Sequence, residues 1–203
     1  KAAGARTIVN EISPRRRGLL EAMGFDKVMG EDAEQLHNLL PDEDRPTVVV
    51  MNPPFSNAGH RGVTKDLMIG ANHIDAALKV LQDGGRLVAI VGRGMAMDAP
   101  TYAKWWNDLR KTYTVKANVA VAGDVYKKLG TAFGTRLLVI DKTGPQTGAI
   151  VSGEVDTIPD LIRRLEDVRD ARSAPRPVEP GSRAEAGGDG DRLPVDQQPA
   201  TAD

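Results

Sequence analysis

The chain has 203 residues, of which 40% are hydrophobic, and this suits one ordinary domain with a buried core. Its formal net charge is −1, which excludes a strongly basic nucleic-acid coat and leaves any nucleic-acid binding to a local patch. It contains no cysteine, which excludes disulfides and thiolate metal sites. No apolar run approaches the roughly 18 residues of a membrane span. We therefore expect a cytoplasmic protein without membrane contact.

Short β-branched runs alternate with helical patterns from the start of the chain. Pro14 suits the first turn of a helix and Gly24 suits its end, so the residues between them are expected to be helical. The arginines at 15–17 are interpreted as a solvated face of that helix. The elements predicted for the first half are a strand at residues 7–9, a helix at 13–23, a short strand at 27–29, a buried strand at 47–51 and a helix at 67–81.

The same alternation continues through the second half of the chain. Its predicted elements are strands at residues 86–91, 113–121 and 136–140, the last clear strand, and helices at 100–111 and 160–171. No helical pattern separates the last two strands, so we expect them to form an antiparallel hairpin. The alternation predicts an α/β fold, with a doubly wound, mostly parallel Rossmann-like sheet, helices on both faces and a C-terminal antiparallel hairpin.

The end of the chain differs in composition from the rest. Residues 172–203 contain five Pro, four Gly and no aromatic residue, so we expect a disordered linker or tail. The α/β domain is expected to span residues 1–143, and residues 144–171 are interpreted as a connecting segment that carries a surface helix. A basic loop at residues 59–65 is a candidate for a segment that closes over a substrate.

One tetrapeptide, Asn52-Pro53-Pro54-Phe55, directly follows a predicted strand, where open α/β sheets place their ligands. The Asn52 side-chain oxygen and the Pro53 carbonyl can accept the two N–H groups of an aromatic amine and aim its lone pair at a methyl donor. The prolines fix φ and carry no N–H, so the turn is rigid and rich in acceptors. Phe55 offers a flat face on which a base can stack. The alternative is a strand that simply ends at a Pro-rich turn.

This motif, with its flanking strands, resembles the class I S-adenosylmethionine-dependent amino-methyltransferases, in which an Asn/Asp-Pro-Pro-aromatic turn grips the target amine. More narrowly, the segments 8–11, 50–56 and 85–95 are similar to the methyltransferase-like region of bacterial strawberry-notch-type methylase/helicase proteins. The resemblance covers about residues 6–143. It implies S-adenosyl-L-methionine as cofactor, DNA as the nucleic-acid partner, and further helicase or NTPase domains in the same parent chain.

The resemblance also assigns roles to individual residues. Glu11, followed by Ile12, matches the acid that accepts hydrogen bonds from the cofactor ribose. Asp32, followed by Ala33, matches the acid that accepts from the cofactor's adenine amino group. The alternatives are an exposed Glu at a strand end for Glu11 and a helix N-cap for Asp32, and the two roles of Asp32 can coexist.

An aromatic residue before the last predicted strand is a second candidate for base stacking. Phe133 occupies the place where DNA-adenine relatives pack an aromatic ring on a flipped base, so Phe55 and Phe133 would sandwich the target. The alternative is a hairpin Phe buried in the core, and Tyr126 is another candidate for the stacking role. The run Gly92-Arg93-Gly94 is interpreted as a strand-end loop, and the histidines show no metal-ligand spacing.

The cofactor glycine loop of this fold lies about 20 residues ahead of the ribose acid. Only ten residues precede Glu11, and Gly4 is the one glycine among them. We therefore expect the first strand and its glycine loop to be missing from these 203 residues, and the fragment alone to be inactive. That strand lies between the strands ending at Glu11 and Asn52, which would then face a gap or pair directly with each other.

The function expected from these residues is methyl transfer from S-adenosylmethionine to an exocyclic amino group, with adenine N6 in DNA as the leading acceptor. The same turn serves other amines, so guanine N2 in RNA and a protein Gln amide are alternatives. A third alternative is a non-catalytic nucleic-acid-binding module of a larger helicase. The balanced charge favours that last interpretation, or a partner domain that supplies the DNA-binding surface.

Overall fold

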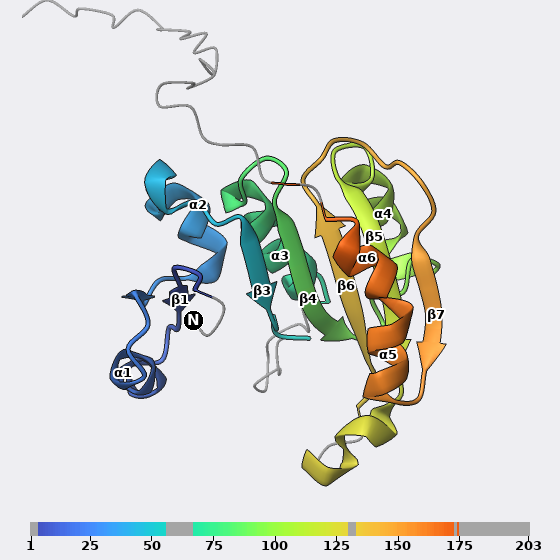
Figure 1. Cartoon of the computed structure of the whole chain (residues 1–203), viewed down its shortest axis with the longest axis horizontal. Coiled ribbons are helices and arrows are strands. Elements are labelled where there is room, and N and C mark those ends of the chain that lie inside the picture. Colours follow the sequence, from blue (N-terminus) through green and yellow to red (C-terminus); the bar gives the residue numbers. More distant parts are fainter. Residues whose placement is uncertain (1–3, 56–66, 130–132, 173, 175–203) are drawn as a thin grey trace, which may run out of the picture.

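The computed structural model describes residues 4–55, 67–129, 133–172 and 174, and these form an α/β fold with two separate sheets (Figure 1). The smaller sheet pairs β1 (Ile8–Asn10) with β2 (Lys27–Met29) in parallel. The larger sheet has the order β3-β4-β6-β5-β7, in which only β6 is antiparallel to its neighbours. Its strands are β3 (Val48–Met51), β4 (Arg86–Gly92), β5 (Thr114–Val121), β6 (Thr135–Asp141) and β7 (Val151–Val155).

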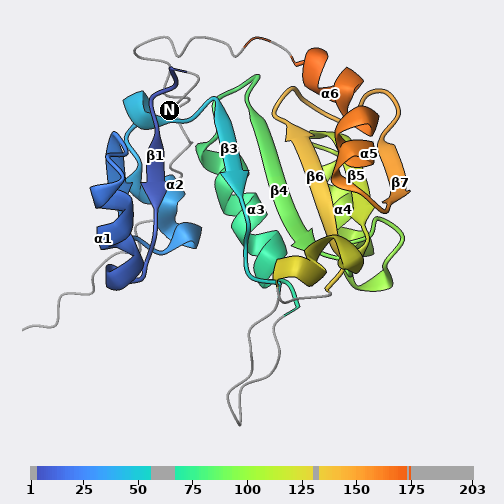
Figure 2. The same ribbon diagram turned by 60° about the horizontal axis from the view of Figure 1, so that its bottom comes forward.

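Helices cover both faces of the larger sheet (Figure 2). On one face, α3 (Ile69–Val80) and α4 (Ala103–Leu109) bury Ile74, Leu78 and Trp106 against Leu87 and Ile140. The opposite face carries a second core, in which α5 (Ile158–Arg164) and α6 (Glu166–Asp170) pack on strand residues of the alternate set. The remaining helical elements are α1 (Pro14–Ala22), α2 (Leu36–Leu39) and the 3₁₀ turns η1 (Ala33–Gln35), η2 (Asp42–Asp44), η3 (Pro100–Tyr102) and η4 (Gly123–Leu129).

Most of the elements expected from the sequence are confirmed, including the antiparallel β5–β6 hairpin. The predicted last strand is not the last, because β7 follows it and pairs in parallel with β5. The stretch between β5 and β6, which shows no helical pattern, contains η4. The basic loop at 59–65 and residues 175–203 of the expected tail lie outside the described residues. No helix in the part of the chain that the structure describes is long and apolar enough to cross a membrane.

The strand at β3 was expected to be buried, and this is wrong for one of its faces. Val48 is 39% exposed and Val50 is 79% exposed, whereas Val49 and Met51 pack on the core below α3. The reason is that β3 is an edge strand: within the described residues it pairs only with β4, and β1 pairs only with β2. The strands that end before Glu11 and Asn52 therefore face each other unpaired, which is one of the two arrangements expected.

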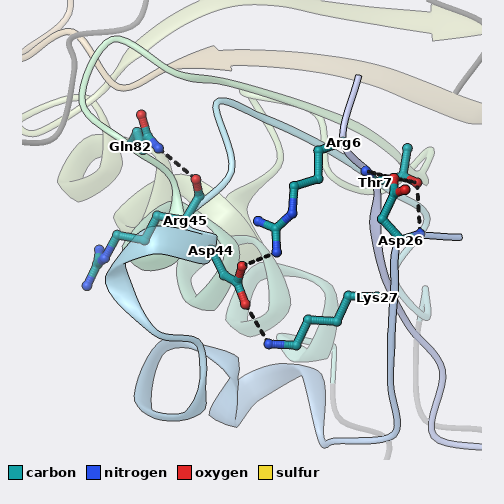
Figure 3. Close-up of polar contacts among 7 residues, drawn as sticks. All are labelled: Arg6, Thr7, Asp26, Lys27, Asp44, Arg45 and Gln82. Carbon is teal, nitrogen blue, oxygen red and sulfur yellow. Dashed lines mark hydrogen bonds and ion pairs between the residues drawn. The ribbon is translucent and has the colours of Figure 1, made fainter. Parts of the chain in front are cut away.

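A buried carboxylate connects the two sheets (Figure 3). Asp44, which ends η2 just ahead of β3, is 6% exposed and accepts hydrogen bonds from Arg6 Nη2 and Lys27 Nζ, each at 2.5 Å. Arg6 lies ahead of β1 and Lys27 begins β2, so one side chain holds the starts of both strands. The ammonium of Lys27 and then the guanidinium of Arg6 hold the pKa of Asp44 below its usual range.

Neighbouring contacts fix the chain on both sides of this ion pair. Asp26 accepts hydrogen bonds from the Thr7 backbone N–H and hydroxyl, at 2.7 and 2.8 Å, which ties the start of β1 to β2. Gln82 donates to the Arg45 carbonyl at 2.7 Å, which ties η2 to the segment after α3. In addition, α2 and η1 pack on α3. The smaller sheet is thus held beside the larger one without strand pairing.

We expect Asp44→Asn to lower the thermal unfolding temperature at pH 7, because Arg6 and Lys27 then lose their shared anion. The pKa of Asp44 is lowered in the folded state, so its stabilisation is present above the unfolded pKa of about 4 and is lost as pH falls through the folded value. Unfolding scans between pH 3 and pH 7 should show the difference between the two proteins shrink at acid pH.

The control for this variant is Asp42→Asn, because Asp42 pairs with Arg45 on the same turn but is 70% exposed at its side chain. Equal unfolding temperatures for wild type and Asp44→Asn at pH 7 would show that this ion pair does not hold the sheets together.

Candidate functional site

A cavity of about 650 Å³ lies between the two sheets, along β1 and β3 and beyond their carboxyl ends. Its floor is apolar, from residues of β1, β3, α2 and α3. Most of its polar groups lie where the strands end, and Asp44, ahead of β3, lines it at the opposite end. The predicted site residues that line it are Glu11, Ile12, Asp32, Ala33, Asn52, Pro53 and Pro54. The structure therefore brings the two sets expected for cofactor and target amine to one cavity. Phe55 and Phe133 are not part of its lining.

The turn after β3 fits closely between the start of α3 and the end of β4. A Cβ built on Gly70 would lie 3.3 Å from the Pro54 carbonyl oxygen, and one built on Gly92 would lie 3.3 Å from the Phe55 Cβ. Both separations are tighter than ordinary van der Waals contact, so glycine at these two places lets the turn sit where it does. The sequence alone predicts no role for Gly70 and indicates only that Gly92 is part of a strand-end loop.

The exposure of the residues in this turn is compatible with the roles predicted for them. Pro53 is buried, whereas Asn52 and Pro54 are exposed and Phe55 is 42% exposed. The buried proline anchors the turn, and the amide of Asn52 stays open to the cavity that it lines. This arrangement can present acceptors to a ligand, and it leaves part of the Phe55 ring open to solvent.

Phe133 lies at the same end of the sheet as Phe55. It comes two residues before Thr135, the β6 residue that pairs with Gly92, and Gly92 in turn contacts Phe55. Phe133 is 76% exposed, so the alternative of a ring buried in the core is wrong. The other stacking candidate, Tyr126, is half-buried and its hydroxyl lies 3.0 Å from the Thr135 hydroxyl.

Glu11 is held by the first turn of α1. Arg16 donates from Nε and Nη2 to the two carboxylate oxygens, each at 2.8 Å, and the Ser13 backbone N–H donates to Oε1 at 2.7 Å. The Arg16 hydrogen bonds, followed by that of Ser13, lower the pKa of Glu11 to about 2. Glu11 is therefore a fixed anion rather than a loose strand-end side chain. Arg16 is exposed, like its neighbour Arg15, as the solvated interpretation expects, and in addition it pairs with Glu11.

Asp32 is a helix N-cap, which is one of the two roles predicted for this residue. Its Oδ1 accepts from the Glu34 backbone N–H at 3.0 Å, which begins η1 at Ala33. The cap uses one carboxylate oxygen, and Asp32 is exposed and lines the cavity. The capping role and a ligand-binding role are thus compatible in the same side chain.

The site has no arrangement that suggests a bound metal. Among residues 4–55, 67–129, 133–172 and 174, no three His, Asp or Glu side chains gather closely enough to hold an ion. His73 lines the cavity and its Nε2 lies 3.8 Å from Glu34 Oε1. The chemistry that the cavity can support with its own residues is hydrogen-bond acceptance by carboxylates, an amide and backbone carbonyls.

No protein-family model and no curated protein matches the chain, but solved structures resemble it. A protein described as a modification subunit of a type I restriction enzyme from Vibrio vulnificus has a TM-score of 0.56 at 16% identity, over 80% of this chain and 40% of its own. The M protein of the type I restriction enzyme EcoKI gives 0.53 at 15%, over 71% and 35%. A protein described as a class I S-adenosylmethionine-dependent methyltransferase from Listeria monocytogenes gives 0.58 at 14%, over 80% and 53%.

These similarities show the fold. The chain has the α/β fold of class I S-adenosylmethionine-dependent methyltransferases, as the sequence predicts. It spans between 35% and 53% of the lengths of these three proteins. At identities this low, structural similarity shows a shared fold, and the activity has to be argued from the site itself.

We expect Arg16→Ala to raise the pKa of Glu11 from about 2 towards its usual value near 4.5, because the largest cause of the lowering is removed. The pKa should stay below the usual value, since the Ser13 N–H still donates to the carboxylate. An NMR titration of the Glu11 carboxyl carbon measures this directly. Arg15→Ala is the matched control on the same helix and should leave the Glu11 titration unchanged. A Glu11 pKa that does not move in Arg16→Ala would contradict this assignment.

Proposed function

We propose that this chain is part of an S-adenosylmethionine-dependent methyltransferase that acts in the cytoplasm on an exocyclic amino group, with adenine N6 in DNA as the acceptor. The observation that carries the proposal is the shared cavity. It holds Glu11 and Asp32 at one side and the turn Asn52-Pro53-Pro54 at the other, beyond the carboxyl ends of β1 and β3. The fold adds support, because similar structures include proteins described as methyltransferases.

The acidic residues fit the polar groups of the proposed cofactor. Glu11 is anionic and fixed by Arg16 and Ser13. A carboxylate has about four lone-pair sites and three are used, so one site, on Oε2, remains to accept from a ribose hydroxyl. Asp32 would accept from the adenine amino group with the carboxylate that also caps η1. Ile12 and Ala33, next to these acids, line the same cavity and offer apolar contact to the flat base.

The turn after β3 would orient the acceptor amine. The Asn52 Oδ1 and the Pro53 carbonyl would each accept one N–H, which draws the nitrogen towards a tetrahedral geometry and directs its lone pair. When bound, the cofactor would supply the methyl group. Asn52 and Pro53 would hold the amine in line with it, and the proton of the methylated nitrogen would pass to solvent. No strong general base is required, which agrees with a turn that contributes acceptors and no titratable side chain.

The aromatic residues would hold the target base outside the duplex. Phe55 and Phe133 are both partly open to solvent at the end of the sheet where Gly92 pairs with Thr135. Two rings at one edge can stack on opposite faces of a base that has been flipped out. DNA is the favoured acceptor because the similar structures include subunits of type I restriction enzymes.

A second candidate is a non-catalytic nucleic-acid-binding module within a larger protein of the strawberry-notch-type methylase/helicase kind, with helicase or NTPase domains as its partners. One observation favours it: β1 and β3 leave a gap in the sheet beside the proposed cofactor site, so turnover by these residues alone is not expected. In this case the fold and the aromatic residues would serve binding only.

The function is tested with the full-length parent protein and S-adenosylmethionine that carries a labelled methyl group. DNA, RNA and protein acceptors are supplied separately, and the labelled product is identified by mass spectrometry. The proposal predicts N6-methyladenine in DNA. Label in guanine N2 of RNA or in a Gln amide would keep the turn's role but change the acceptor. Binding of DNA without label in any acceptor would support the non-catalytic candidate.

We expect Asn52→Ala in the full-length protein to lower methyl transfer by about 10²–10³-fold, the range found when a comparable transition-state hydrogen bond is removed. Affinity for the cofactor should be unchanged, because Asn52 is proposed to grip only the acceptor. Single-turnover rates and cofactor titration measure the two effects. The matched control is Asn107→Ala, since Asn107 is an exposed residue of α4 that is not part of the cavity lining. Near-full turnover in Asn52→Ala would contradict the assignment.

We expect Phe133→Ala to weaken binding to DNA with an unpaired target base more than binding to ordinary duplex. Stacking contributes about 1–3 kcal/mol per base, which is roughly a 5- to 150-fold change in Kd. Fluorescence anisotropy with the two DNAs gives the ratio. Ile162→Ala is the control, because Ile162 is 56% exposed on α5 and packs on no base in this scheme. A change that is equal for both DNAs would show that Phe133 does not stack on the target.

A further inference from the structure

The hydrogen bonds between β1 and β2 end on a side chain instead of on the backbone. The Glu11 N–H donates to the Met29 carbonyl, and a regular parallel ladder would continue from the Glu31 N–H to the Glu11 carbonyl. Instead, the Glu31 N–H donates to the side-chain Oδ1 of Asn10, at 3.0 Å. The last step of the ladder thus passes from the main chain to an amide side chain.

The Asn10 amide uses its other end on the same residue. Its Nδ2 donates to the Glu31 carbonyl at 2.9 Å, so one side chain pairs with both polar groups of one backbone residue. An asparagine can do this because its amide carries a donor and an acceptor, whereas an aspartate carries acceptors only. Asn10 is half-buried and Glu31 is exposed, so this amide holds the chain near the surface and does not fill the core.

The two residues joined in this way directly precede the two acids of the proposed cofactor site. Asn10 comes before Glu11, Glu31 comes before Asp32, and all four line the cavity. The Glu31 carbonyl belongs to the planar peptide unit that leads to Asp32. The bond from Asn10 Nδ2 therefore holds the backbone that carries Asp32, and one amide connects the two ends of the site.

The segment around Asp32 has further contacts, but these are to its own turn and to α1. The Asp32 carboxylate accepts from the Glu34 N–H, and its carbonyl accepts from the Gln35 N–H at 2.9 Å. These bonds set the shape of the turn and not its distance from β1. A Cβ built on Gly30 would overlap the guanidinium of Arg17, so glycine there lets α1 lie against the segment.

Glu11, in contrast, is held independently of Asn10. Arg16 and the Ser13 N–H fix its carboxylate from the first turn of α1. Loss of the Asn10 amide should therefore displace Asp32 while the Glu11 carboxylate keeps its place. The two acids respond differently to the same change, and this difference can be measured.

We propose that Asn10 is a positioning residue that makes the site selective for adenine, by fixing Asp32 at the distance from Glu11 that one adenosine spans. This inference rests on the proposed function, because it takes the adenosyl group as the ligand of the cavity. Held in place, the Asp32 carboxylate accepts from the adenine amino group and repels a base with a carbonyl there, such as hypoxanthine. Selectivity for the ribose hydroxyls depends on Glu11 and not on Asn10.

The test is calorimetric titration of the full-length parent protein with S-adenosylhomocysteine, S-inosylhomocysteine and 2′-deoxy-S-adenosylhomocysteine. Asn10→Ala should lower the preference for the adenosyl over the inosyl ligand by at least about tenfold, the lower end of the range for a hydrogen bond to a charged group. The preference for ribose over deoxyribose should stay. Asn10→Asp keeps the size of the side chain and should also lower the adenine preference, because its carboxylate cannot donate to the Glu31 carbonyl.

Thr7→Val is the matched control. The Thr7 hydroxyl donates to Asp26 at 2.8 Å, so it also connects β1 with β2, but at the opposite end of the two strands and outside the cavity lining. This variant should keep both preferences, whatever its unfolding temperature.

Two results would overturn the role of Asn10 alone. One is an unchanged adenine preference in folded Asn10→Ala and Asn10→Asp. The other is an equal fall of both preferences, or loss of folding in both variants, which would assign Asn10 a structural role only. A wild-type protein that binds none of the three ligands would instead contradict the proposed function itself, and this inference with it.

Discussion

Two parallel strands, β1 and β3, are held beside each other without hydrogen bonds between them, and the candidate site depends on that constraint. A buried carboxylate, Asp44, fixes the starts of β1 and β2 through Arg6 and Lys27, and α2 packs on α3 from the side. The carboxyl ends of both strands therefore line one cavity, which also extends between the strands along their length. Most polar groups of the cavity lie at the carboxyl ends of the strands, and the side chains along β3 are apolar.

Local sequence signals were enough to predict the elements that build this arrangement. Runs such as 47–51 and 86–91 are short and β-branched, and they became strands whose bounds differ by a residue or so. The sequence also predicts that Asn52-Pro53-Pro54-Phe55 directly follows a strand, because the end of a β-branched run marks the end of the strand. Strand β7 was missed because Ser152, Gly153 and Glu154 interrupt its apolar pattern, and its pairing with β5 is a tertiary effect.

The sequence could not predict contacts between residues that belong to different elements. Gly70 and Gly92 make room for Pro54 and Phe55 from different elements, and no local pattern marks a glycine as a clearance position. The pairing of Arg16 with Glu11 required the course of the chain from β1 into α1, although the spacing of five residues at a helix start was a signal that could have found it. The exposure of Val50 likewise follows from what lies beside β3, which its own sequence does not encode.

The proposed function depends on one cavity, in which an adenosyl group would bind between Glu11 and Asp32, next to the turn at Asn52. The most direct measurement is chemical-shift mapping of the protein, extended ahead of Lys1, with S-adenosylhomocysteine. We predict saturable shifts at the backbone amides of Glu11, Asp32 and Asn52, with none in the smaller cavity that Glu154 and Arg163 line. Saturable shifts confined to that second cavity, or binding that leaves the amides of Glu11 and Asp32 unchanged, would contradict the account.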